Sequence, residues 1–105
     1  MEFLVRVRVR FPSDIDAGLK AAIMREERER GAALRASGHL LRAWRIPGRV
    51  EALLLWRVKH ATELHDIISS LPVYPYCAEV EVEALAEHPI DPTSHEPRPA
   101  ADRSD

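Results

Sequence analysis

The sequence lacks three features that would each indicate a particular class of protein: cysteine pairs, long apolar runs and an excess of one charge. Its single cysteine, Cys77, cannot form an internal disulfide, and no His/Cys pair has metal-ligand spacing, so we expect no structural zinc. The longest apolar run, Ala52–Trp56, is far shorter than the roughly 20 residues that cross a bilayer. Fifteen basic and seventeen acidic residues give a net charge of −2, which argues against a nucleic-acid partner. Because Glu2 stands where a signal peptide would be positive, we expect a cytoplasmic protein.

Alternation of apolar and polar residues predicts three stretches of β-structure. The first is residues 2–11, and the last is Cys77–Leu85. Between them, Leu40–Val58 reads as two strands folded back at Pro47-Gly48, because Pro fixes φ at one turn position and Gly accepts a positive φ at the next. The second strand of this hairpin has apolar residues on both faces, so we expect both faces to be covered. One of these faces carries Val50, Ala52, Leu54, Trp56 and Val58.

Two segments have helical periodicity. The first is predicted to begin between residues 14 and 17, where side chains can cap a helix, and to run to Ala36, just before Gly38. The second is His60–Leu71, which ends at Pro72. The resulting order, β-α-β-β-α-β, predicts an α+β, ferredoxin-like antiparallel sheet in which the first and last strands are neighbours.

Opposite charges on the first and last strands predict how they pair. In an antiparallel pair of strands, the residue numbers of facing partners always add up to the same value. Three arginine–glutamate pairs of the first and last strands share one such value, so a single register could bring all three together. A second hypothesis, that these arginines bind an anionic ligand, stays open. The expected pairs are Arg6 with Glu83, Arg8 with Glu81, and Arg10 with Glu79.

The apolar face of the first predicted helix is interrupted by a carboxylate. Ile23, Glu27, Gly31 and Leu34 fall on one line at helical spacing, so Glu27 is directed toward the core. A glycine in a helix interior costs about 0.5–1 kcal/mol relative to alanine, and room beside Glu27 is one use that would compensate for it. Spacing alone favours the other interpretation, in which Glu27 is a half-exposed structural carboxylate paired with Arg28, Arg30 or a neighbouring chain.

The chain resembles the muconolactone Δ-isomerase family from its start to about Asp91. No single stretch is specific, but together they are. The matching stretches are Phe11-Pro12, Ser37-Gly38, Leu41–Gly48 with Trp44-Arg45-Ile46, Leu64-His65-Asp66, Leu71-Pro72 with Pro75-Tyr76, and Glu83–Pro89.

The resemblance implies a fold, an assembly and a reaction. We expect a domain over residues 1–91 whose sheet pairs with a second copy as a dimeric α/β barrel, with further assembly into decamers. The implied reaction moves a proton along an unsaturated lactone, without metal or organic cofactor. Residues 92–105 form a Pro-rich tail, which we expect to be partly disordered and mobile after about Glu96.

The resemblance also implies a site with a small-molecule substrate. Glu27 matches the family's proposed base. The family's His-Tyr-x-Asn pattern is replaced by Arg49–Ala52, which predicts a different, more apolar carbonyl substrate. Two other hypotheses stay open on this fold: a non-catalytic ligand-binding protein and a cofactor-independent oxygenase or cyclase. The candidate substrate-contacting residues are Ile23, Trp44, Val50, Ala52, Leu54, Tyr76 and His88.

Overall fold

The computed structural model describes residues 1–91, and their elements follow the predicted order; residues 92–105, which include the predicted mobile tail, lie outside the described part. A single-turn 3-10 helix at Tyr74–Tyr76 precedes the last strand. The main elements are β1 (Glu2–Val9), α1 (Ala17–Ala36), β2 (Leu40–Arg45), β3 (Glu51–Arg57), α2 (Ala61–Ser69) and β4 (Cys77–Leu85).

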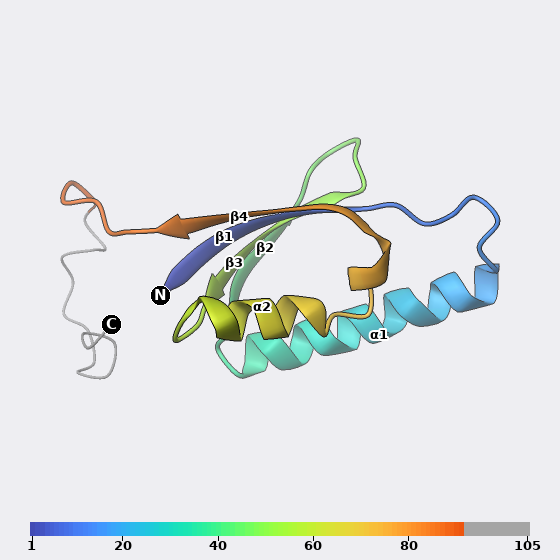
Figure 1. Cartoon of the computed structure of the whole chain (residues 1–105), viewed down its shortest axis with the longest axis horizontal. Helices are drawn as coiled ribbons and strands as arrows, with labels where there is room; N and C mark the ends of the chain where they lie inside the picture. Colours follow the sequence, from blue (N-terminus) through green and yellow to red (C-terminus); the bar gives the residue numbers. More distant parts are fainter. Residues whose placement is uncertain (92–105) are drawn as a thin grey trace.

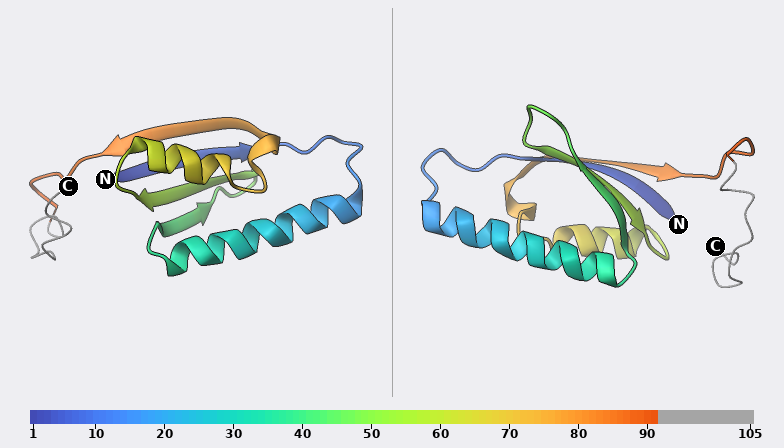
Figure 2. Two further views of the ribbon diagram at one scale, coloured as in Figure 1. Left: turned by 60° about the horizontal axis from the view of Figure 1, so that its bottom comes forward. Right: turned by 180° about the vertical axis from the view of Figure 1, so that it is seen from behind.

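The four strands form one antiparallel sheet in the order β2-β3-β1-β4, and both helices lie against the same face of it (Figures 1 and 2). This is the predicted ferredoxin-like arrangement, with the first and last strands as neighbours. The core lies between the sheet and the helices, where alternate residues of β1 and β3 meet apolar residues of α1 and α2. Its members include Phe3, Val5, Val7, Ile23, Leu34, Trp56, Leu64 and Ile68.

Local signals account for the helix ends. The Asp16 carboxylate accepts a hydrogen bond of 2.9 Å from the Leu19 amide, which satisfies one free donor at the start of α1. Gly38 has a φ of 83°, a conformation that favours glycine, and the chain turns there into β2. Within residues 1–91, neither helix is long and apolar enough to span a membrane.

The predicted register of β1 against β4 was wrong by two residues. Strand β1 ends at Val9, which pairs with Cys77 after a register shift, and the Arg10 amide then donates to the Tyr76 carbonyl. Both registers set valine against valine, but the predicted one makes three arginine–glutamate pairs and the observed one only two, so the charge pattern favoured the wrong register. The observed partners are Leu4 with Glu83, Arg6 with Glu81, and Arg8 with Glu79.

A register irregularity near the start of β2 decides which side chains face the helices. Leu40 pairs with the buried Trp56, but the next pair joins Arg42 to Leu55, so the pairing skips Leu41. An extra residue of this kind reverses the alternation of the strand. As a result Ala43 and Arg45 lie on the helix-facing side, while Arg42 and Trp44 lie on the open side. In the open-side pair, the Arg42 guanidinium lies 4.9 Å from the Trp44 ring.

Candidate functional site

One side of α1 carries three residues that face an open cleft. Lys20, Met24 and Glu27 follow one another at intervals of four and three, which places them on one stripe of the helix. Seven residues at about 1.5 Å of rise each separate Lys20 from Glu27 by about 10 Å along the axis. The helix therefore presents an ammonium and a carboxylate to the same space, two turns apart.

The cleft has a volume of about 1040 Å³ and lies between the first half of α1, the end of β1 and the β2–β3 hairpin. The sheet wall is largely apolar and includes Val7, Ala52 and Leu54. Leu71 and Val73, which follow α2, line the cleft beside Glu27. Four further cationic residues line it: Arg8, Arg10, Arg45 and Arg49.

The Glu27 carboxylate is half-buried and held by one backbone contact. The Val73 amide donates a hydrogen bond of 3.1 Å to its Oε1 atom. Burial raises the pKa of Glu27 above its ordinary value of 4.5, and the Val73 hydrogen bond and the nearby Arg30 charge only partly oppose this. Glu27 forms no ion pair within residues 1–91. A carboxylate with a raised pKa and one unbonded oxygen is suited to accept a proton from a ligand.

The second carboxylate of the cleft, Glu51, is in the opposite electrostatic state. It is only 6% exposed, and Arg8 and Arg6 donate hydrogen bonds of 2.9 and 3.1 Å to its two oxygens. Burial acts to raise its pKa, but these hydrogen bonds and the Arg8 and Arg49 charges outweigh it and hold the pKa below 4.5. Glu51 is therefore ionised, and both of its oxygens accept hydrogen bonds from arginines, whereas Glu27 has one oxygen free to contact a ligand. The same arginines also approach Glu79 and Glu81 of β4.

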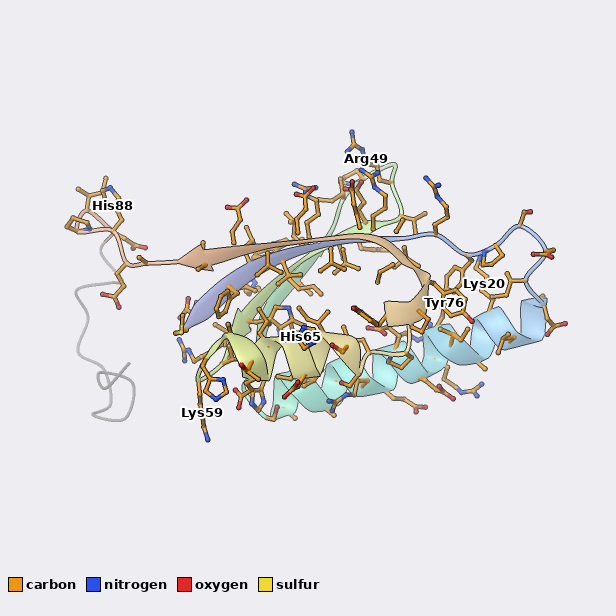
Figure 3. The ribbon with its side chains drawn as sticks, in the orientation of Figure 1. Lys20, Arg49, Lys59, His65, Tyr76 and His88 are labelled. Carbon is orange, nitrogen blue, oxygen red and sulfur yellow. The ribbon has the colours of Figure 1, made fainter. Side chains whose placement is uncertain are left out.

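Four predicted site residues are brought together in the cleft: Glu27, Val50, Ala52 and Leu54. The others do not line it within the part of the chain that is described. Ile23 is buried in the core, and Trp44 lies on the open face of the sheet because of the β2 irregularity. Tyr76 packs behind the cleft, with its ring 5.0 Å from that of Phe11. His88 lies beyond the end of β4, at the opposite end of the molecule from Lys20 (Figure 3).

The cleft also contains residues that the sequence did not single out, chiefly Lys20 and Arg45. Lys20 shares the stripe of Glu27, and this spacing was the signal that could have identified it. Its ammonium lies 5.2 Å from the centre of the Phe11 ring, close to the Phe11–Tyr76 pair (Figure 3). Arg45 had no such signal, because strict alternation from Leu40 places it on the wrong face.

Neither metal nor thiol chemistry has support here. Within residues 1–91 no group of three or more His, Cys, Asp or Glu side chains is placed to hold a metal ion. The Cys77 thiol donates to the Val73 carbonyl at 3.4 Å, and burial together with the Glu27 charge raises its pKa, so it is a neutral thiol.

Comparison with known proteins gives one consistent result. The family model "Muconolactone delta-isomerase" matches residues 1–91. Muconolactone Delta-isomerase 2 of Acinetobacter lwoffii is 38% identical over 84% of this chain and 91% of its own, and the Rhodococcus opacus enzyme is 33% identical over 85% and 95%. A crystal structure of muconolactone isomerase superposes with a TM-score of 0.83 at 30% identity, covering 88% of this chain and 95% of that one. A Burkholderia phenoliruptrix dehydrochlorinase, with a TM-score of 0.60 at 15% identity, shares only the fold.

Proposed function

The chain belongs to the muconolactone Δ-isomerase family and is an isomerase, and from this premise we propose that Glu27 moves a proton within an unsaturated lactone or a related carbonyl compound. The observation that carries this proposal is the state of Glu27: half-buried in a cleft, unpaired, with a raised pKa. Glu27 shares the cleft with the apolar wall that includes Ala52 and Leu54, and an apolar wall suits the ring of a small lactone.

The proposed reaction needs one base and no other reactant. The free Glu27 oxygen takes a proton from the ring carbon at the far end of the C=C bond that is conjugated with the carbonyl, and the electrons of the broken C–H bond form an extended enolate. Glu27 then returns the proton to the carbon next to the carbonyl, so the double bond shifts by one position and the base is regenerated. The Val73 amide bonds only Oε1, which leaves the second oxygen for this transfer.

The pH dependence follows from the state of the base. Only ionised Glu27 can accept a proton, so kcat/KM should rise as pH rises through its pKa. Because burial raises this pKa above 4.5, the rise is expected at a higher pH than for an exposed glutamate.

The test replaces Glu27 with glutamine, which keeps the shape and the hydrogen bond from Val73. Isomerisation of muconolactone, followed by ultraviolet absorbance, should fall by about 10²–10⁴-fold. Exchange of the substrate's acidic proton in deuterated water should fall in parallel, because the same group carries that proton. Glu26→Gln, one residue away and exposed, is the matched control and should retain full activity. Unchanged turnover by Glu27→Gln would end this assignment.

The proposal includes assembly with further copies of the chain. The face of the sheet opposite the helices carries partly buried Leu4, Leu53 and Leu55, and Trp44 is 39% exposed beside them. No element of residues 1–91 covers this face (Figure 2). We place a second copy there, as in a dimeric α/β barrel, with decamers as the larger assembly and a cytoplasmic location. Light scattering at micromolar concentration tests the dimer, and a stable monomer would refute it.

A further inference from the structure

Two cations from opposite walls converge on the cleft without a carboxylate partner. Lys20 comes from α1 and Arg45 from the end of β2, and within residues 1–91 neither forms an ion pair. Exposed cations on a protein surface normally need no ligand. These two differ because each is directed into the cleft by its position in the fold.

Arg45 is the less ordinary of the two. It pairs with Ala52 on the helix-facing side of the sheet, where the neighbouring positions are Ala43 and Leu54. The Arg45 side chain is exposed, so its guanidinium stays solvated at the rim of the cleft and is free to bind an anion there. The irregularity in β2 is what directs Arg45 rather than Trp44 to this side.

Three other arginines line the cleft, and two of them approach a carboxylate. Arg8 is occupied by Glu51 and Glu79, at 2.9 and 3.5 Å. Arg49 lies 3.7 Å from Glu51, at the tip of the hairpin on the side away from the helices (Figure 3). The third, Arg10, forms no ion pair within residues 1–91 either, but it follows the end of β1. Lys20 shares the helix stripe of Glu27, and Arg45 pairs with the cleft-lining Ala52, so we take these two as the charges that a ligand against Glu27 would meet.

We propose that Lys20 and Arg45 bind the carboxylate of an acidic substrate and determine its selection over uncharged analogues. This inference rests on the proposed function, because it places the reacting carbon at Glu27 and the carboxylate toward Lys20. It replaces the more apolar substrate predicted from Arg49–Ala52. Of those residues, Val50 and Ala52 are apolar residues that line the cleft, while the charge of the substrate is recognised by Lys20 of α1 and Arg45 of β2.

The test compares muconolactone with its methyl ester, which keeps the lactone ring but has no negative charge. Lys20→Gln and Arg45→Gln should each raise KM for the acid by about tenfold, the worth of one charge-assisted hydrogen bond at a partly exposed site. The KM for the ester should change by less than about twofold, since no charge is lost there. Arg45→Lys should recover part of the loss, because the charge remains while the two-pronged geometry does not.

The chain offers a matched control for each cation. Arg42→Gln removes an arginine from the same strand but the opposite face, and Lys59→Gln removes the second of the chain's two lysines, far from the cleft (Figure 3). Both should leave KM for acid and ester unchanged. Titration calorimetry of muconolactone with Glu27→Gln, alone and combined with each substitution, reports binding without turnover and should show the same tenfold differences.

The outcomes separate this inference from the proposed base. If Lys20→Gln and Arg45→Gln behave like the controls, or weaken acid and ester equally, the anion site is refuted even if Glu27→Gln is inactive. If they weaken only the acid while Glu27→Gln retains activity, the anion site stands and the base is wrong. A wild-type protein that neither binds nor isomerises muconolactone would refute both.

Discussion

Gly31→Ala should stabilise the protein, because this glycine has no structural role in the isolated chain. It lies inside α1, one turn beyond Glu27, where glycine costs about 0.5–1 kcal/mol relative to alanine. A Cβ atom built at Gly31 would meet nothing within 4 Å, so the new methyl group neither clashes nor gains contacts. The free energy of unfolding should therefore rise by the propensity difference alone, about 0.5–1 kcal/mol.

Denaturant unfolding at one fixed protein concentration measures this change, since assembly would otherwise alter the apparent stability. The midpoint should rise with the slope unchanged, and the melting temperature should rise by about 2–8 °C for a domain of this size. Ala32→Gly is the matched control: it is the exposed neighbour in the same helix and should lose a similar amount.

Two results would contradict this reasoning. A destabilised Gly31→Ala variant would mean that another copy of the chain packs against this side of α1 and needs the space. A stable variant with much lower kcat/KM would mean that the substrate uses the gap beside Glu27, as the sequence suggested. We expect neither, because Gly31 does not line the cleft within residues 1–91.

Two further predictions concern stability and pH. Glu27 has a raised pKa, so its ionisation costs stability as pH rises above 4.5. Glu27→Gln should therefore match wild type below that pH and become more stable than wild type above it. Unfolding free energies measured at a series of pH values would contradict this if the difference had the opposite sign. Glu51 has a lowered pKa, so the stability that it contributes is present above pH 4.5 and lost as pH falls below it. Glu51→Gln should be less stable than wild type at pH 7, and this difference in unfolding free energy should shrink in acid. A difference independent of pH would refute the role assigned to its arginine partners.

The sequence identified Glu27 but not its neighbours on α1, and the reason is geometric. Leu19, the apolar neighbour of Lys20, is 49% exposed, while Ile23 and Leu34 are the buried residues of the helix. The helix is rotated so that the stripe of Lys20, Met24 and Glu27 faces the cleft. A helical pattern gives the relative positions of residues on a helix, but only packing against the sheet fixes which stripe faces inward.

Trp44 and Arg45 show why single irregularities limit such predictions. Trp44 is one of the candidate substrate contacts that the family resemblance implies, and strict alternation would put it on the same side of β2 as Leu40. One skipped residue in the pairing of β2 reverses this. The sequence has no glycine or proline at that point to reveal it. The charges of β1 and β4 also misled, because the predicted register makes three arginine–glutamate pairs and the observed one only two.

The charges of the cleft explain why a carboxylate base would need cations beside it. An acidic substrate brings a second negative charge to Glu27, and at roughly 7 Å and an effective dielectric constant of about 20 the two repel by about 2 kcal/mol. Lys20 and Arg45 would offset this repulsion during binding. When Glu27 takes the proton it becomes neutral, and the negative charge passes to the enolate on the ligand. Cations located at the ligand rather than at Glu27 then stabilise the intermediate more than the ground state, which is the condition for accelerating the reaction.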